Sequence, residues 1–249
     1  MDTISHISLS LARAMQVNLE TTAANLGNVS TAGFKAEHPA FETLLHRAGP
    51  ERIKDSVSFV SLRGGYVDER SGGVVMTGNP TDVAVQGDAW FAYRTPEGQL
   101  ALGRDGRFLT DQNGTLMTVS GAQVLGPDGA PIAIPPEQLD GLKVAQDGTL
   151  AGPDGQAFGR IGLFQLDEAD GMRKIEGGLY LVDGPAADAL VPAPFGAVIQ
   201  GAIEQSNVQP VLEMTRMMEV NAAYDRANRI INDRNDLQKT FIERIGRFG

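Results

Sequence analysis

The sequence contains no cysteine, which excludes disulfide bonds, thiolate nucleophiles and cysteine-ligated metals. It also lacks any apolar run of the roughly 20 residues that cross a bilayer. No basic segment followed by an apolar one stands at the N-terminus, so no cleavable secretory signal is visible. We therefore expect no membrane span. The protein is either cytoplasmic or exported by a route that reads no cleavable signal.

Signatures of bound nucleotides, metals and acyl-enzyme chemistry are missing as well. There is no GxxxxGK[ST] segment, no GxGxxG after a strand and no GxSxG nucleophile motif. The three histidines, His6, His38 and His46, have no second histidine at the helical spacing of a zinc site. The segment DQNGT, residues 111–115, resembles the start of a calcium loop, but Ala122 occupies the position of its bidentate carboxylate. We expect no catalytic residue, no cofactor and no metal.

Positive charge is scarce in the middle of the chain. The formal net charge is −10, from 21 Lys and Arg against 31 Asp and Glu. Residues 1–34 carry −1 and residues 207–249 carry +1, so −10 falls on residues 35–206. An acidic body of this kind argues against nucleic acid and anionic lipid as partners, and solubility is a sufficient reason for it.

Glycine and proline are almost absent from the two ends. Of 30 glycines 26, and of 13 prolines 12, lie between residues 35 and 206. Both residue types disrupt helices and serve turns, so this distribution favours helical ends around a non-helical middle. The predicted fold class is α+β.

Both ends carry apolar stripes with a helical period. The first, from Ile4 to Val29, covers 25 residues in seven steps, which is the 3.6-residue period of an α-helix. The second, from Met217 to Phe248, covers 31 residues in nine steps, about 3.4 per step and near the 3.5 of a coiled-coil seam. Pro210 fits the first turn of this second helix. We expect the two helices to pair as a coiled-coil-like domain, and further chains to cover the flanks that a pair leaves exposed.

The middle of the chain favours β-strands. Six Asp-Gly or Asn-Gly pairs between residues 105 and 171 are typical of tight hairpin turns. Short runs such as DVAVQGDAWFAYR and RIGLFQL lie between the glycine-rich segments and indicate strands. The predicted division is an N-terminal helix over 1–34, an extended connector over 35–75, an inserted β-rich domain over 76–205 and a C-terminal helix over 206–249. A short helix in PAFETLL is an option within the connector.

The segment AANLGNVSTAGFK, residues 23–35, concentrates polar residues and glycines at the end of the first helix. Gly33 is expected to adopt the left-handed conformation that terminates a helix. Asn25, Asn28 and Thr31 are expected to satisfy the last backbone groups, or those of a neighbouring subunit, where water is excluded. Phe34 is expected to fill a pocket beside the chain exit.

Two features of the second helix predict further contacts. Three methionines between residues 214 and 218 are typical either of core packing or of an adaptable contact surface. Asn221, Asn228 and Asn235 recur every seven residues, either as a polar flank or as buried residues that set the register of a helix pair.

The end segments resemble the signatures of the bacterial flagellar rod and hook proteins. AANLGNVSTAGFK is similar to the family's ANN-[LI]-AN-x-x-T-x-GFK, and SNVQPVLEMTRMMEVNAAYDRAN is similar to its SNV-x-x-V-x-EM-x-x-MI-x-x-QRAYEAN. The stretch TGNPTDVAVQGDAWF resembles the family's central TGNPLDLAI-x-G-x-GFF. Ala24 departs from the family's first Asn, Asn221-Ala222 from Gln-Arg and Ala89-Trp90 from Gly-Phe. The opening MDTISHISLSLARAM and the chain length favour a proximal-rod member, ahead of the distal-rod paralogue and the longer hook protein.

This resemblance implies a structural subunit and not an enzyme. Members of the family are exported through the flagellar type III channel without signal cleavage and polymerise into the helical rod that crosses the periplasm. The expected partners are copies of the same chain, other proximal and distal rod proteins and the export apparatus, with no nucleic acid. The terminal helices are expected to form the inner tube of the basal-body rod, and the β-rich domain is expected to face outward.

The residues expected at the subunit interface lie in or beside the terminal helices. On the N-terminal side they are Leu11, Met15, Leu19, Asn25, Leu26, Asn28, Thr31, Gly33 and Phe34. On the C-terminal side they are Ser206, Asn207, Val208, Pro210, Glu213, Met214, Met217, Met218, Asn221, Tyr224, Asn228, Ile231 and Phe241.

Two alternatives from other classes stay open on the sequence. The first is a periplasmic glycan-binding or glycan-cleaving β domain with helical oligomerisation arms. Two of Asp82, Asp88, Glu97 and Asp105 would then supply the carboxylate pair that glycoside cleavage needs. The second is a coiled-coil adhesin that forms a closed oligomer with a fixed copy number.

Overall fold

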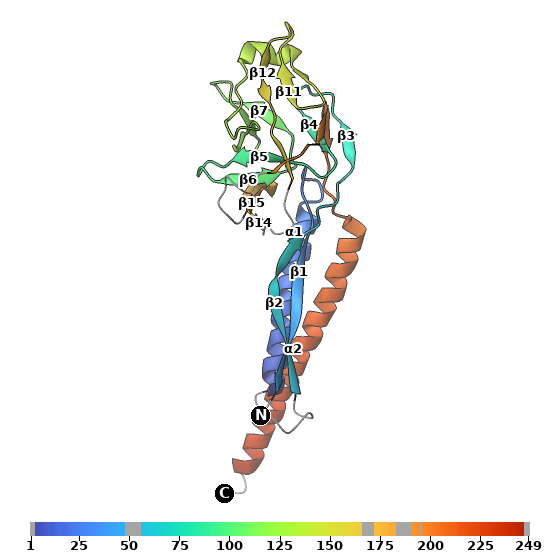
Figure 1. Ribbon diagram of the computed structural model, residues 1–249. Helices are drawn as coiled ribbons and strands as arrows, with labels where there is room; N and C mark the ends of the chain where they lie inside the picture. Colours follow the sequence, from blue (N-terminus) through green and yellow to red (C-terminus); the bar gives the residue numbers. More distant parts are fainter. Residues whose placement is uncertain (1–2, 48–55, 166–171, 183–190, 195, 247–249) are drawn as a thin grey trace. The chain divides into compact units, whose positions relative to one another are not determined.

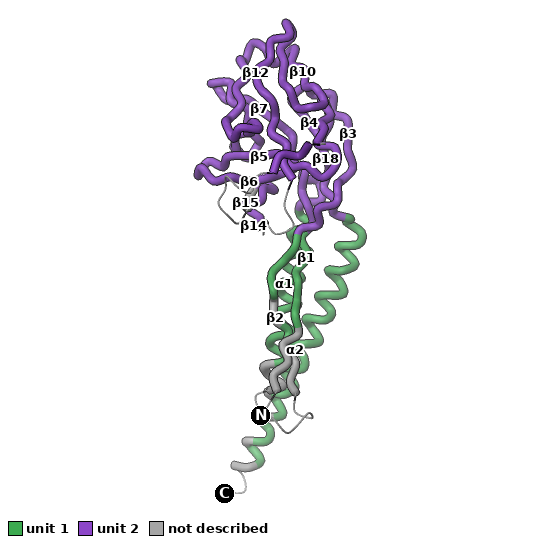
Figure 2. The backbone as a smooth tube through the Cα atoms, in the orientation of Figure 1, with its two compact units in different colours: residues 1–27, 37–66, 209–249 green, residues 28–36, 67–208 purple. Residues whose placement is uncertain are grey.

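The computed structural model describes residues 3–47, 56–165, 172–182, 191–194 and 196–246. A long helix stands at each end of the chain, and short strands fill the sequence between them (Figure 1). The predicted α+β class is therefore confirmed. The chain divides into two compact units, coloured separately in Figure 2. Unit 1 comprises residues 1–27, 37–66 and 209–249, and unit 2 comprises residues 28–36 and 67–208.

Unit 1 combines the two long helices with a two-stranded sheet. The helices are α1 (Thr3–Gly27) and α2 (Pro210–Gly246), and the strands are β1 (Glu37–Arg47) and β2 (Ser56–Val67). Helix α1 contacts both α2 and β1. Pro210 opens α2, where its missing N–H removes no helical hydrogen bond. Glu213 in the first turn and Arg244 in the last complement the helix dipole.

Two expectations for the first 50 residues need correction. The first helix ends at Gly27, and turns occupy residues 28–33, where the sequence had suggested a helix to residue 34. The helix considered for PAFETLL is wrong, because this segment lies inside strand β1. Its partner β2 begins nine residues after β1 ends, and pairing with β2 and packing on α1 decide the extended conformation. Such non-local contacts override local helical preference.

The apolar stripe of α1 is only half-buried. Its most buried side chains are small or polar, and they include Ser8, Ala12, Thr22 and Asn25. Small side chains let neighbouring backbones approach the helix closely, so the seam runs along them and the longer apolar residues flank it. Ala23, a member of the predicted stripe, is exposed.

Unit 2 is built almost entirely of short strands. They are β3 (Val74–Met76), β4 (Val83–Gln86), β5 (Trp90–Arg94), β6 (Leu100–Gly103), β7 (Phe108–Thr110), β8 (Leu116–Thr118), β9 (Gln123–Val124), β10 (Lys143–Val144), β11 (Thr149–Ala151), β12 (Ala157–Arg160), β13 (Leu163–Gln165), β14 (Met172–Lys174), β15 (Tyr180–Val182), β16 (Val191–Pro192), β17 (Ala197–Gln200) and β18 (Ala202–Glu204). Short 3-10 helices span Pro136–Gly141 and Glu176–Gly178.

One large sheet holds most of these strands. It has nine strands, seven of them in the order β14-β15-β6-β5-β9-β8-β7, and β13 joins β5 to β16. Three smaller sheets pair β10-β11-β12, β17-β4 and β18-β3. Strand β5 is central, and its residues Trp90, Phe91, Ala92 and Tyr93 are all buried, which agrees with the unbroken apolar run in the sequence. Phe91 packs edge-on against Phe108, with ring centroids 5.3 Å apart.

The turn prediction holds at four of the six Asp-Gly and Asn-Gly pairs. Gly114, Gly129, Gly148 and Gly155 all have positive φ. Gly106 does not, and its role is close approach, because a Cβ there would lie 1.6 Å from the carbonyl oxygen of Val83. The sixth pair, Asp170-Gly171, lies outside the described residues.

Candidate subunit interface

A chain of polar contacts ties the elements of unit 1 together. The Asn25 side chain donates to the carbonyl of Glu37 (2.9 Å) and accepts from its N–H (3.0 Å), as a neighbouring strand would. The same amide lies 3.5 Å from Glu213 of α2. Glu213 also pairs with Arg216 (3.4 Å), and a guanidinium nitrogen of Arg216 lies 3.0 Å from His38 Nδ1 on β1. These contacts fix α1, α2 and β1 in one register.

The two helices of unit 1 run antiparallel, with the end of α1 beside the start of α2 (Figure 1). The inner face of α2 carries the predicted stripe: Val220 and Ala227 are buried, and Met217, Tyr224 and Ile231 are half-buried. Phe248, the last member of that stripe, lies outside the described residues.

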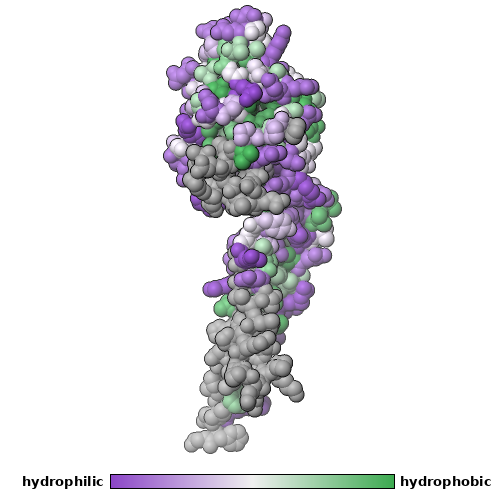
Figure 3. Space-filling model, viewed as in Figure 1, coloured by the Kyte–Doolittle hydropathy of each residue, from purple (hydrophilic) through white to green (hydrophobic). Residues whose placement is uncertain are grey.

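The outer face of α2 exposes a second set of apolar side chains. Val211 is 77% exposed and Met218 is 66% exposed, and Leu212, Met214 and Ile230 are exposed as well. Figure 3 shows hydrophobic atoms, in green, over the first turns of this helix. Scattered apolar residues are normal on a protein surface, but a run on one helix is typical of a contact site. Of the three methionines, two therefore face outward and Met217 lies partly against the seam.

The segment after α1 belongs to unit 2. Thr31 Oγ1 donates to Asn28 Oδ1 (3.1 Å), which closes a local turn. Gly33 has φ of 67°, the left-handed conformation expected from the sequence, but it stands six residues beyond the helix end. A Cβ on Gly33 would lie 2.2 Å from the backbone carbon of Arg104, so glycine is required by the closeness of two backbones.

Phe34 fills a pocket inside its own unit. Its ring is buried with Ala36 and Val208, and Val29 packs against the same cluster. Lys174 Nζ lies 3.9 Å from the ring centroid, a cation–π contact.

The segment before α2 is held just as firmly. Asn207 Oδ1 accepts from the N–H of Ala36 (2.8 Å), and its Nδ2 donates to the carbonyls of Asp68 (2.7 Å) and Arg70 (2.9 Å). Ser206 Oγ accepts from the N–H of Val208 (3.2 Å). One asparagine thus joins three stretches of chain that are far apart in the sequence.

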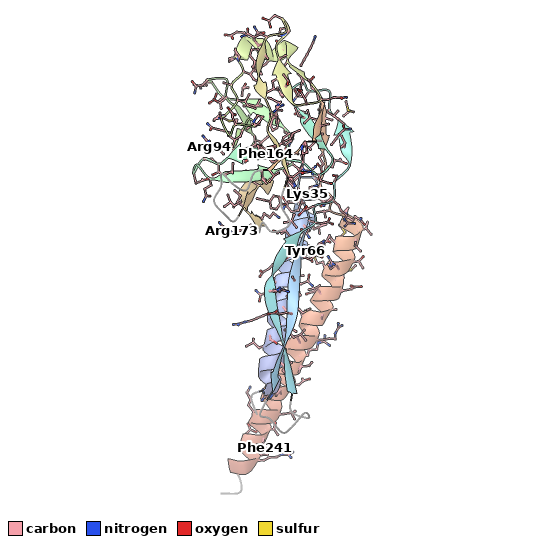
Figure 4. The ribbon with its side chains drawn as sticks, in the orientation of Figure 1. Lys35, Tyr66, Arg94, Phe164, Arg173 and Phe241 are labelled. Carbon is pink, nitrogen blue, oxygen red and sulfur yellow. The ribbon has the colours of Figure 1, made fainter. Side chains whose placement is uncertain are left out.

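The centre of this region is a buried charge cluster formed by Lys35, Arg104 and Glu204. Lys35 Nζ lies 2.7 Å from Glu204 Oε1, and an Arg104 guanidinium nitrogen lies 3.0 Å from Glu204 Oε2, with all three side chains essentially inaccessible. Trp90 covers both cations, with its ring centroid 5.8 Å from Lys35 Nζ and 5.1 Å from Arg104 Cζ. Figure 4 labels Lys35. Each terminal segment supplies one member and the β-sheet supplies the third.

Backbone groups complete the cluster. The N–H of Gly72 donates to Glu204 Oε1 (2.8 Å), Lys35 donates to the Arg70 carbonyl (2.9 Å), and Arg104 donates to the Gly87 carbonyl (2.9 Å). Burial lowers the pKa of Lys35 and of Arg104, and the Glu204 carboxylate opposes that shift in both cases. Two cations share one carboxylate, so the cluster depends on Glu204.

Tyr93 beside this cluster gives unit 2 a dependence on alkaline pH. Its hydroxyl donates to the Asp105 carbonyl (2.8 Å), and burial, with a smaller contribution from the Asp105 charge, raises the pKa of Tyr93 well above 10.0. The unfolded chain releases this proton near pH 10 and the folded chain keeps it, so stability falls as pH rises above that value.

We therefore expect Tyr93→Phe to narrow its stability deficit at high pH. Near pH 7 the variant should lose about 1 kcal/mol for the missing hydrogen bond. Between pH 10 and 11 the difference from the parent chain should shrink by up to about 1.4 kcal/mol. Urea unfolding at pH 7, 9, 10 and 11 measures it, with pH 7 and 9 as the internal control. A difference that stays constant to pH 11 contradicts the assignment.

The structure sorts the predicted interface residues into three groups. Several are buried inside their own unit: Asn25, Gly33, Phe34, Val208 and Glu213. Half-buried ones are Leu11, Met15, Leu19, Leu26, Asn28, Thr31, Ser206, Asn207, Met217, Tyr224, Asn228 and Ile231. Exposed ones are Pro210, Met214, Met218, Asn221 and Phe241. Asn221 therefore acts as a polar flank within this chain, and the side chain of Asn235 lies outside the description.

Sequence reasoning missed the charge cluster. Lys35 stood in the GFK motif, Trp90 was noted only as a departure from the family pattern, and Glu204 was not singled out. The available signal was a charged residue inside otherwise apolar or glycine-rich stretches, as in LGRDG for Arg104 and GAIEQ for Glu204. Pairing such residues requires the tertiary structure.

The carboxylates considered for glycan chemistry have structural partners. Asp82 accepts hydrogen bonds from Thr77 (2.7 Å) and Asn79 (3.0 Å), and Asp105 pairs with Arg107 (2.7 Å). Glu97 lines a cavity of about 290 Å³ in which it is the sole acidic residue among the lining side chains that the structure describes. Cleavage of a glycosidic bond uses two carboxylates, and this cavity offers one.

No cluster of metal-ligating side chains is found among the described residues. Within the same part of the chain, neither long helix is apolar enough to cross a bilayer. What remains is a β-rich unit without a reaction site and a helical unit with an exposed apolar face. Together these features define a structural, assembling protein.

Comparison with known proteins gives the family. A model described as "Flagellar hook protein FlgE/F/G D1 domain" matches residues 84–152, and one described as "Flagellar basal body rod FlgEFG protein C-terminal" matches residues 199–244. The chain is 35% identical over 241 residues to the flagellar basal-body rod protein FlgF of Mesorhizobium japonicum, covering 97% of each chain.

Relatives in a single species separate two members of this family. The chain is 32% identical to the FlgF of Caulobacter vibrioides, covering 99% of each chain. It is 29% identical to the FlgG of the same species, covering 88% of this chain and 90% of that one. The chain belongs to the flagellar basal-body rod protein family, most like FlgF, and is a structural rod subunit rather than an enzyme.

Proposed function

We propose that this chain polymerises through its terminal helices into the axial tube of the proximal flagellar rod. In this proposal α1 and α2 pair in coiled-coil fashion as the inner layer, and the β-rich part is an inserted domain that faces outward. The observation that carries it is the exposed apolar face of α2, which includes Val211, Met214 and Met218 and has no cover within the described chain.

The buried polar contacts support a rigid building block. Asn25, Glu213 and Arg216 hold the helices and β1 of unit 1 in one register, while Lys35 and Glu204 hold the segments that adjoin the helices inside unit 2. A subunit of a tube must present its contact faces in a fixed geometry, because small errors accumulate along a helical polymer. On this basis Asn25, Phe34 and Glu213 preorganise the helices, and the outward-facing residues make contacts with neighbours.

The proposal extends to location and partners. The subunit is exported by the flagellar type III apparatus without cleavage of a signal, crosses into the periplasm unfolded or partly folded, and adds to copies of itself and to other proximal and distal rod proteins. The acidic charge of residues 35–206, with neither a basic patch nor a bilayer-spanning helix in the described chain, is consistent with protein partners only.

Replacing Tyr224 tests the assembly role of the helices. Tyr224 is half-buried on the inner face of α2, and Tyr224→Ala removes a large amphipathic ring from that seam. We expect swimming and the amount of subunit in isolated basal bodies to fall several-fold, with secretion changed less, since export does not need the assembled geometry. The neighbouring exposed residue gives the control, Asp225→Ala, which should swim normally. Normal motility in Tyr224→Ala would refute the assignment.

A further inference from the structure

The C-terminal part of α2 extends past the start of α1. The 3.5 Å contact between Asn25 and Glu213 sets the level of the two antiparallel helices. Thr3, twenty-two residues before Asn25, therefore lies level with Asn235, twenty-two residues after Glu213. Helix α2 continues to Gly246, so its last eleven residues, about 17 Å at 1.5 Å per residue, have no α1 beside them. Figure 4 shows Phe241 on this overhang.

Burial along α2 changes at the same point. Glu213, Val220 and Ala227 are spaced by seven residues and are buried, and Arg234 is half-buried. Phe241 is the next member of the series and is 59% exposed, and Leu237, one turn before it, is 71% exposed. Every side chain described between residues 236 and 244 is exposed. The overhang thus continues the seam that α1 covers in its own chain, without the cover.

A second uncovered patch lies at the opposite end of the same helix. Val211, Met214 and Met218 follow a spacing of three and four residues on the face turned away from the seam, and all are exposed. Methionine thioethers adapt to irregular partners and contact aromatic rings favourably. We call Val211, Met214 and Met218 the head patch, and Leu237 and Phe241 the tail patch.

We propose that the tail patch of one copy of this chain binds the head patch of a second copy. The two patches differ in composition and are separated along α2 by 23 residues from Met214 to Leu237, about 35 Å at 1.5 Å per residue. A contact between unlike patches, repeated with an axial shift of this size, does not close on itself and builds an open filament. This inference rests on the proposed function and specifies which surfaces of the helices meet.

Thiol cross-linking in basal bodies tests the contact, because the chain has no cysteine of its own. The double variant Met218→Cys/Phe241→Cys replaces the parent chain in cells, and isolated basal bodies are treated with a short bismaleimide. We expect adducts at multiples of the chain's mass. Met214→Cys/Leu237→Cys, a second head–tail pair, should give the same ladder. Each single variant should give none.

The matched control keeps the tail position and moves the other cysteine off the head patch. Asp225→Cys/Phe241→Cys places it on an exposed residue of α2 between the patches, and no adduct is expected. Equal cross-linking in this control, adducts from single variants, or adducts only at masses of other chains would overturn the head–tail contact while leaving the rod assignment intact. Absence of the parent chain from isolated basal bodies would instead overturn the proposed function and the inference with it.

Discussion

Replacing Glu204 with glutamine is expected to lower the free energy of unfolding of unit 2 by about 3–5 kcal/mol, the cost of breaking a buried ion pair from one side. Glu204 is the one carboxylate within reach of both Lys35 Nζ (2.7 Å) and the Arg104 guanidinium (3.0 Å) in the described cluster. The glutamine side chain has nearly the same shape but is neutral, and one of its two terminal atoms is a donor. Two buried cations would then share a single neutral acceptor.

The protein carries its own probe for this measurement. Its single tryptophan, Trp90, stacks over both cations, so its fluorescence reports on the cluster during urea unfolding. The matched control is Glu97→Gln, which makes the same chemical change at an exposed site and should stay within about 0.5 kcal/mol of the parent chain. A loss below about 1 kcal/mol in Glu204→Gln would show that the cluster contributes little to stability.

Gly33→Ala is expected to destabilise unit 2 by about 3 kcal/mol or more, since it combines a strained conformation with a steric clash. At φ of 67° a residue with a Cβ is disfavoured, and the added carbon would lie 2.2 Å from the Arg104 carbonyl carbon and 2.3 Å from the Asp105 nitrogen. Both neighbours are backbone atoms and cannot rotate away. The strand end that carries Arg104 must therefore move away from Glu204.

Two companion variants separate the causes. Gly27→Ala, at the last residue of α1, meets no atom within 4 Å and has no positive φ, so it should be neutral or stabilise by about 0.5–1 kcal/mol. Gly33→Asn tolerates the left-handed conformation but keeps the clash, so it should be nearly as harmful as Gly33→Ala. Urea unfolding followed by Trp90 fluorescence measures all three. Full stability in Gly33→Asn would show that φ alone, and not the close approach, selects glycine. We also expect Gly33→Ala to reduce rod assembly more than secretion.

The unit boundaries show where local reading of the sequence succeeds. Both long helices follow from apolar periodicity and from the scarcity of glycine and proline, and four turn glycines follow from Asp-Gly and Asn-Gly pairs. The inner stripe of α2 from Met217 to Ile231 follows from its period as well. All of these depend on contacts between residues close in the chain, which the sequence pattern records directly.

The strand β1 and the segment after α1 show where such reading fails. PAFETLL has no strong local preference, and its strand depends on β2 and on the backbone contacts of Glu37 with the Asn25 side chain. The polar density of residues 25–31 suggested capping of the helix end. Asn25 instead imitates a strand edge, an arrangement that exists only when β1 lies beside α1.

The sequence by itself determined the α+β class, the helical ends, the turn positions and, through its end motifs, the rod family. The tertiary structure alone decided that Lys35, Arg104 and Glu204 meet, although Lys35 and Glu204 are 169 positions apart in the chain. It also decided which apolar residues of α2 are covered, since cover depends on where α1 begins beside it. Periodicity shows which face of a helix is apolar, but only the packed neighbours show where that face ends.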